Sequence, residues 1–169
     1  MTVLAFGWVL TGLVILVSGL AARRHPRALL AGLGATAFAM AGLGAVGNAV
    51  LVATGYDFSG AFGASYSAVV RDGLGTAGSA LESMFVALLI AFQACAGLLI
   101  LFGGRWLQVG LGAAIAFQLG LLAFGWWYFL TSPLLVLGLV LLWRAYRHEQ
   151  DRPLYVPDIL RAHEHDRGR

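Results

Sequence analysis

The chain contains no lysine, and only 11% of its 169 residues are charged. In an ordinary soluble domain about a quarter of the residues are charged. Hydrophobic residues make up 60% of the chain, and the mean hydropathy is +0.83. The composition therefore excludes an ordinary soluble domain and indicates a single domain that is solvated by lipid.

Residues that carry chemistry are scarce. Cys95 is the single cysteine, which excludes an intrachain disulfide, a CxxC redox pair and a cysteine metal site. No histidine falls in an apolar stretch, so a membrane haem held by two histidines is excluded. The His–Glu pairs at 148–149 and 163–166 match no metal-site spacing and are typical of a solvated tail. No Gly-x-Ser-x-Gly, Walker or HExxH motif is present. We predict no catalytic residue and no metal site, and a non-enzymatic protein is favoured.

Five apolar stretches are long enough, or nearly so, to cross a bilayer; they cover about 3–20, 28–54, 81–102, 106–124 and 130–146. Pro133 is expected near the start of the fifth helix, where its missing N–H costs little. The sequence thus predicts an all-α membrane protein with one transmembrane domain over 1–147. Residues 55–80 form an extracytoplasmic connection, and 148–169 form a cytoplasmic tail.

The arginines predict the orientation of the chain. Ten of the eleven lie in residues 23–27, at Arg105, or in the tail from Arg144 onward, and only Arg71 lies elsewhere. Cytoplasmic loops are rich in basic residues, and these three places share a side only if the chain crosses five times. We expect a multi-pass protein of the bacterial plasma membrane, with the N-terminus outside and the C-terminus inside.

Aromatic and basic side chains support that orientation. Trp8 and residues 126–128 are predicted at the outer interface, and Trp106, Trp143 and Tyr146 at the inner one. The basic residues form no aromatic-interleaved patch, so nucleic acid is not an expected partner. The residues expected to contact anionic lipid headgroups are Arg144, Arg147 and Arg152.

Small residues recur at four-residue spacing in three of the stretches. Helices in lipid associate through close backbone approach at small residues. We therefore predict that spans two to four form the tightly packed unit, with a homodimer face as the alternative use of these ridges. The ridges are Ala37, Ala41, Ala45 and Ala49; Ala87, Ala91 and Cys95; and Gly112, Ala116 and Gly120.

Four polar residues within the spans are the candidate site residues, because a polar group in hydrocarbon is costly without a partner. We predict two layers, with Asn48 beside Glu82 near the outer end and Gln93 beside Gln118 near the midplane. Interhelical hydrogen bonding is the favoured use; a ligand or quinone-headgroup site and a proton path are the alternatives. Glu82 is either buried, or hydrated near the N-terminus of its helix, where the dipole favours a carboxylate.

The outer connection predicts a short amphipathic helix that carries Phe58, Phe62, Tyr66 and Val69 or Val70 at helical spacing. Its aromatic side chains would enter the lipid or cap the bundle, in one version as a lid over Asn48 and Glu82. Arg71 and Asp72 are the charged residues of this outer segment.

The run Ala87-Leu-Leu-Ile-Ala-Phe-Gln-Ala-Cys-Ala-Gly-Leu-Leu-Ile-Leu-Phe-Gly-Gly-Arg105, followed by an Ala/Gly-rich helix, resembles the DoxX/DoxX-like membrane family. The stretch from Ala41 to Gly47 resembles the first helix of that family, and the resemblance covers roughly residues 35–125. It implies a membrane partner of redox enzymes, as in quinone-linked sulfur oxidation or oxidant defence. The family usually has four helices, and Gln93 stands where it commonly has Glu.

The leading functional hypothesis is a small membrane subunit or scaffold that holds a protein partner, or a second copy, through small-residue helix faces. The alternative is a quinone- or lipid-binding redox component with a polar pocket between spans two, three and four. Quinone is the only cofactor considered. A small-solute transporter is the third hypothesis, disfavoured because inverted repeats and broken helices are not evident.

Overall fold

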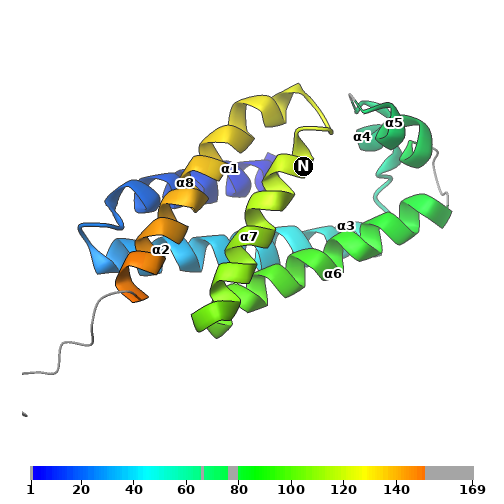
Figure 1. Ribbon diagram of the computed structural model, residues 1–169. Helices are drawn as coiled ribbons and strands as arrows, with labels where there is room; N and C mark the ends of the chain where they lie inside the picture. The colour runs from blue at the N-terminus through cyan, green and yellow to red at the C-terminus, as the bar shows by residue number, and fades with distance from the viewer. Residues whose placement is uncertain (1, 66, 76–79, 151–169) are drawn as a thin grey trace, which may run out of the picture.

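The computed structural model describes residues 2–65, 67–75 and 80–150, and none of these residues is in a β-strand. Long helical rods run between two ends of the molecule, and two short helices lie beyond them at one end (Figure 1). The prediction of an all-helical chain is confirmed. The rods are α1 (Thr2–Ala21), a continuous helix made of α2 (Pro26–Ala37), η1 (Phe38–Val46) and α3 (Gly47–Ala53), then α6 (Ala80–Phe102), α7 (Gly104–Leu121) and α8 (Trp126–Gln150).

Two of the described helices are long and apolar enough to cross a membrane. Helix Pro26–Ala53 has a mean hydropathy of 1.8 and helix Ala80–Phe102 one of 2.6, while Phe6–Ala21 is a shorter apolar helix. Half of the most apolar part of Pro26–Ala53 is buried, against 28% for Ala80–Phe102. The second rod is therefore central in the bundle, and α6 keeps one side uncovered.

Tight turns separate the rods where the sequence places glycine or proline. Pro26 occupies the first turn of α2, where a missing N–H is tolerated. Gly55 has a φ of 74°, and the Tyr56 N–H donates to the Leu51 carbonyl at 2.9 Å, which closes the C-terminus of α3 as a Schellman motif. Gly103 and Gly104 have φ values of 73° and 56°, which L side chains rarely adopt, and they form the tight turn between α6 and α7.

The second rod contains a π-helix that the sequence did not predict. It spans Phe38–Val46, and the Gly47 N–H donates to the Gly42 carbonyl, five residues earlier. A π-helix takes more residues per turn than an α-helix and usually occurs as a single turn, often at functional sites. Residues that follow η1 are therefore rotated and less advanced along the axis than an uninterrupted α-helix would place them.

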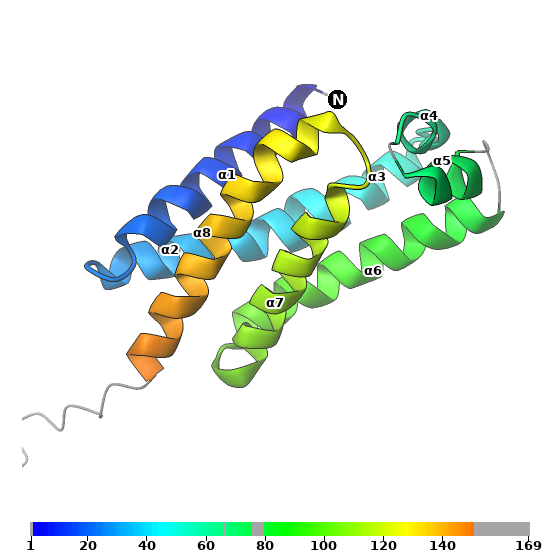
Figure 2. The same cartoon turned by 45° about the horizontal axis from the view of Figure 1, so that its top comes forward.

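The helices approach one another most closely at small residues. A Cβ added at Gly97 of α6 would lie 2.7 Å from the Ala41 Cβ, and one at Gly110 of α7 would lie 2.9 Å from the Ala96 carbonyl oxygen. A Cβ at Gly19 of α1 would lie 2.6 Å from the Gly138 carbonyl oxygen of α8. The prediction that spans two to four are the tightly packed unit was incomplete, because α1 and α8 pack just as closely (Figure 2).

The predicted small-residue ridges are only partly used inside the molecule. Ala37 and Ala45 are buried, but the α6 ridge of Ala87, Ala91 and Cys95 is exposed. Regular spacing defines a helix face without defining which neighbour that face meets. In α7, Ala116 and Gly120 of the predicted ridge are also exposed. The favoured prediction, packing inside the molecule, was therefore wrong for the α6 ridge and for this part of the α7 ridge.

The fifth helix begins earlier than predicted. α7 ends at Leu121 and α8 starts at Trp126, so Pro133 lies inside α8 rather than near its start. A proline there removes one backbone hydrogen bond and crowds the preceding turn. The expectation that Pro133 costs little was wrong for this reason.

The outer connection forms two short helices rather than one, α4 (Ser59–Gly63) and α5 (Ala68–Leu74). Phe62 is buried; its ring centroid lies 5.6 Å from that of Phe85 on α6 and 6.0 Å from that of Phe124. The Ser67 N–H donates to the Ala123 carbonyl at 3.1 Å. Phe62 therefore caps the bundle, which is one of the two roles predicted for the aromatic side chains of this segment. Tyr66 lies outside the described residues.

Candidate functional site

The candidate site residues Glu82, Gln93 and Gln118 lie on the buried faces of α6 and α7. Their exposed fractions are 7%, 2% and 5%, and Asn48 on α3 is half-buried. Val86 lies between Glu82 and Gln93 on the same inward face of α6. Glu82 and Gln93 are eleven residues apart, about three helical turns, and therefore share one face of α6.

Asn48 and Gln93 form the central polar contact. The Asn48 Nδ2 donates a hydrogen bond to the Gln93 Oε1 at 3.0 Å and thereby joins α3 to α6. The predicted pairing of Asn48 with Glu82 was wrong. That prediction assumed a constant α-helical rise through the second rod, whereas η1 advances less per residue. Asn48 lies level with Gln93 rather than with Glu82.

Gly44 of η1 provides the space for the Gln93 side chain. A Cβ at position 44 would lie 2.7 Å from the Gln93 Nε2 and 3.2 Å from the Ala39 carbonyl oxygen. The amide thus lies directly against the backbone of the π-helix. Only glycine at position 44 admits this arrangement without movement of Gln93.

Gln118 pairs with α8 rather than with Gln93, so the predicted central layer was wrong. The Ser132 Oγ donates to the Gln118 Oε1 at 3.4 Å, a long hydrogen bond between two buried side chains. The Gln93 Oε1 accepts a hydrogen bond from Asn48 instead. Sequence reasoning missed Ser132, and the signal that could have found it is a hydroxyl residue inside the fifth apolar stretch.

Glu82 is buried in the first turn of α6. Of the two predicted alternatives, burial is the one observed, because only 7% of the residue is exposed, although Glu82 does lie at the helix end that favours negative charge. The nearby apolar cap consists of Phe62, Leu74 and Val86, with Phe85 and Phe124 against them. Glu82 and the Asn48–Gln93 pair are therefore separate features.

The charged residues of the segment between α3 and α6, which are Asp57, Arg71 and Asp72, are exposed. The Arg71 Nε lies 3.2 Å from the Asp72 Oδ1, and these side chains are 47% and 70% exposed. An ion pair so exposed contributes little to stability. Asp57 accepts a hydrogen bond from the Ser59 N–H at 2.9 Å, and the hydrogen bonds from the Ser59 side chain and backbone lower the pKa of this carboxyl below 3.8.

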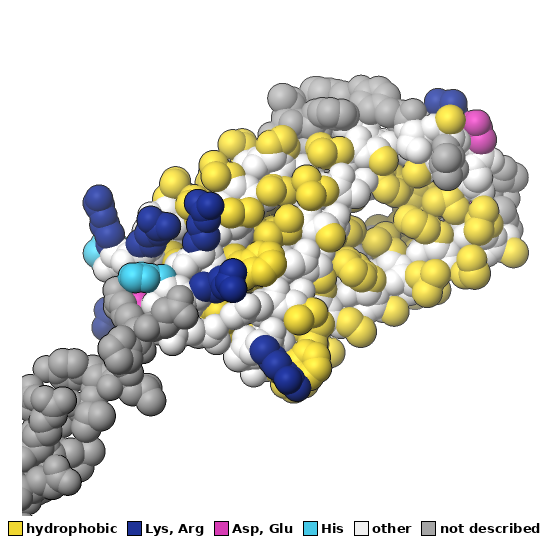
Figure 3. All heavy atoms as spheres, in the orientation of Figure 1, with side chains coloured by type: hydrophobic (Ala, Val, Ile, Leu, Met, Phe, Trp, Pro, Cys, Tyr) yellow, Lys and Arg dark blue, Asp and Glu magenta, His cyan; other side chains and the backbone are white. Residues whose placement is uncertain are grey.

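The opposite end of the molecule carries most of the described positive charge. Figure 3 shows arginine side chains gathered there, and the α1–α2 turn, the α6–α7 turn and the end of α8 lie at this end. The Tyr146 hydroxyl donates to the Gly104 carbonyl at 3.3 Å, and the Gln108 Nε2 donates to the Gln150 Oε1 at 2.7 Å. Arg144 and Arg147 are exposed at the end of α8; Arg152 lies outside the described residues.

The tryptophans predicted at the membrane interfaces differ in their surroundings. Trp106 is exposed beside Arg105, whose guanidinium carbon lies 5.0 Å from the ring centroid. Trp8 is only partly exposed, because its ring packs edge-on against Phe117 at 6.3 Å. The Trp143 Nε1 has no hydrogen-bond partner among the described atoms. The side chains of residues 126–128 lie outside the described ones.

The chemistry available at the buried residues is that of neutral amides and hydroxyls around one carboxyl group. Within residues 2–65, 67–75 and 80–150, no group of three or more His, Cys, Asp or Glu side chains could hold a metal ion. Amide pairs between helices fix rotation and register. The described geometry thus favours interhelical hydrogen bonding as the use of Asn48, Gln93 and Gln118.

Comparison of the chain with protein-family models, with curated proteins and with solved structures gave no match.

Proposed function

We propose that this chain is a DoxX-like, multi-pass subunit or scaffold of the bacterial plasma membrane, holding a membrane-associated partner complex that is redox-linked. It would cross the bilayer five times. The apolar character of Pro26–Ala53 and Ala80–Phe102 supports membrane insertion. Large hydrophobic side chains exposed on the rods also support it, since lipid would cover them; Phe6, Leu13, Leu88, Leu101 and Val109 are among them.

The proposed orientation places the basic end of the molecule in the cytoplasm. Arg23, Arg24, Arg27, Arg105, Arg144 and Arg147 all belong to elements that meet at this end. The positive-inside rule then leaves α4, α5 and the single Arg71–Asp72 pair outside.

The exposed α6 ridge is the observation that carries the scaffold proposal. Ala87, Ala91 and Cys95 recur every fourth residue and face away from the bundle. Small residues allow a second helix to approach closely in lipid, where helices associate through packing rather than through the hydrophobic effect. This face suits a helix of a partner protein, or of a second copy.

The quinone-binding hypothesis is less well supported by the geometry. It needs Asn48, Gln93 and Gln118 to face an open pocket, whereas each of them is hydrogen-bonded to a protein side chain. A scaffold function requires no such pocket, and the paired amides serve it by holding α3, α6, α7 and α8 in register.

Purification of the tagged full chain in a mild detergent tests the proposal. We expect a stoichiometric partner or a homo-oligomer, which Ala91→Leu should release by filling the α6 ridge. The matched control is Ala31→Leu, which changes an alanine that is also exposed, on α2, and this variant should keep the partner. A lone monomer with catalytic turnover would contradict the proposal.

A further inference from the structure

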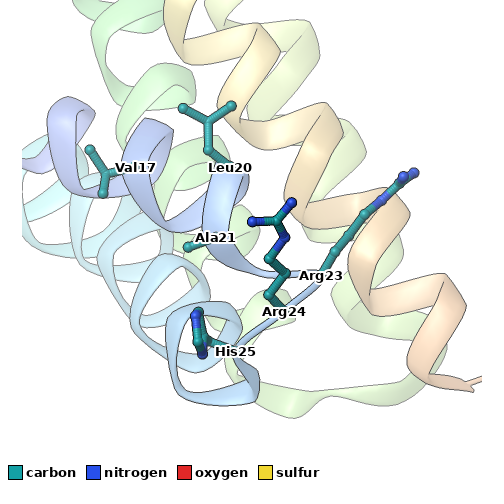
Figure 4. Close-up of a pocket in the computed structure, with 6 residues that line it drawn as sticks. All are labelled: Val17, Leu20, Ala21, Arg23, Arg24 and His25. Atoms are coloured by element: carbon teal, nitrogen blue, oxygen red, sulfur yellow. The ribbon is translucent and has the colours of Figure 1, made fainter.

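A groove at the end of α1 joins an apolar helix face to three basic side chains. It measures about 600 Å³ and is lined by Val17, Leu20, Ala21, Arg23, Arg24 and His25. Figure 4 shows that both arginine side chains extend from the α1–α2 turn toward the side where Leu20 lies. The apolar wall comes from the helix and the basic part from the turn.

The apolar wall continues along α1 as a stripe of exposed side chains. Its members recur every three or four residues and therefore share one face of the helix. From the first to the last, the stripe is about 21 Å long at ~1.5 Å per residue, which exceeds half of a hydrocarbon core of about 30 Å. The stripe consists of Phe6, Leu10, Leu13, Val17 and Leu20, and Arg24 follows four residues later.

The structure shows no acidic partner for the two arginines of the groove among the residues that it describes. Arg71 pairs with Asp72, and Arg105 stacks on Trp106. In the part of the chain that the structure describes, no ion pair joins Arg23 or Arg24 to a carboxylate. Both side chains are exposed, so their hydrogen-bond donors are available to an anion.

We infer that this groove binds one anionic phospholipid, with its phosphate on Arg23 and Arg24 and an acyl chain along the α1 stripe. Guanidinium groups form paired hydrogen bonds to phosphate oxygens, and His25 adds a further polar group at the rim. The apolar stripe ends at the basic turn, so charge and shape both match a lipid with a negative headgroup. The inference rests on the proposed function in that the membrane supplies the lipid and the orientation assigns the inner leaflet.

Native mass spectrometry of the full chain in detergent, titrated with dioctanoyl phosphatidylglycerol, tests the site. We expect this lipid to bind at least about tenfold more tightly than dioctanoyl phosphatidylcholine. The double variant Arg23→Gln/Arg24→Gln should weaken binding about 30-fold, since each arginine near a membrane surface contributes about 1 kcal/mol and about 1.4 kcal/mol is a factor of ten. Arg27→Gln, an exposed arginine outside the groove, is the matched control and should change binding less than about threefold.

Two further measurements separate the headgroup from the acyl chain. Val17→Ala/Leu20→Ala should weaken binding of the lipid while it leaves both arginines in place. Glycerol 3-phosphate, which has the phosphate without acyl chains, should not displace the bound lipid at equal concentration. Displacement by glycerol 3-phosphate would show that the α1 stripe does not contribute to binding and is not part of the site.

Equal affinity for the two lipids, or unchanged affinity in the double arginine variant, would overturn the inference. The assay uses solubilised protein, so neither the orientation nor a partner affects its result. Loss of the partner with retained lipid binding would therefore count against the proposed function alone, and the reverse pattern against the lipid site alone.

Discussion

The Asn48 Nδ2 donates a hydrogen bond to the Gln93 Oε1 at 3.0 Å, which links α3, the helix that follows η1, to the middle of α6. A double-mutant cycle of Asn48→Leu and Gln93→Leu should give a coupling free energy of about 0.6 to 1.7 kcal/mol, the average and the maximum measured for polar contacts between membrane helices. The measurement is thermal or denaturant unfolding in detergent.

Asn48→Leu with Gln118→Leu is the control cycle, because Gln118 bonds to Ser132 instead. These two substitutions should be additive within about 0.3 kcal/mol. A larger coupling between Asn48 and Glu82 than between Asn48 and Gln93 would contradict the described pairing.

Gly44→Ala should destabilise the protein by about 1 to 3 kcal/mol, because the added methyl group overpacks a filled site. The new Cβ would lie 2.7 Å from the Gln93 Nε2, so the amide would have to leave its place beside Asn48. Gly34→Ala in α2 is the matched control, since nothing lies within 4 Å of a Cβ there. That control should be neutral or stabilising by up to about 1 kcal/mol, and equal unfolding temperatures for the two variants would refute the close contact.

Ser59→Ala should raise the pKa of Asp57 toward its ordinary value of 3.8, because the side-chain hydrogen bond from Ser59 is the largest cause of the lowered pKa. A carboxyl group with a lowered folded-state pKa stabilises the fold above pH 3.8, and that stabilisation is lost as the pH falls through the folded-state pKa. Carbon-13 NMR titration of the Asp57 carboxyl carbon measures the change. Thr54→Ala removes a nearby hydroxyl that bonds only to the Val50 and Leu51 carbonyls, and it should leave the Asp57 pKa unchanged.

The helices were predictable because their signals are local. Apolar runs predicted the long helices, and the gap between the predicted stretches 81–102 and 106–124 matches the turn between α6 and α7. The burial of Gln93 and Gln118 followed from the cost of placing polar groups in lipid, whereas burial of Glu82 was one of two alternatives that the sequence left open. These inferences depend on composition and spacing within one helix.

The pairing of side chains between helices was not predictable in the same way. It depends on how each helix is rotated about its axis and on how far along the axis each residue lies. Both quantities change after Val46 because η1 interrupts the α-helical geometry. The predicted packing of the α6 ridge was wrong for a related reason, since spacing identifies a helix face but does not place a neighbouring helix against it. The predicted position of Pro133 near the start of the fifth helix was wrong because α8 already starts at Trp126. Uncertain helix boundaries therefore also limited the prediction.

Cysteine labelling in intact cells tests the five-span orientation most directly, in a Cys95→Ala background that removes the native thiol. Gly60→Cys on α4 and His148→Cys near the end of α8 each place a thiol at an exposed position. A membrane-impermeant maleimide should modify position 60 in intact cells and position 148 only after the cells are permeabilised. Labelling of position 148 but not of position 60 in intact cells, or labelling of both to the same extent, would contradict the account.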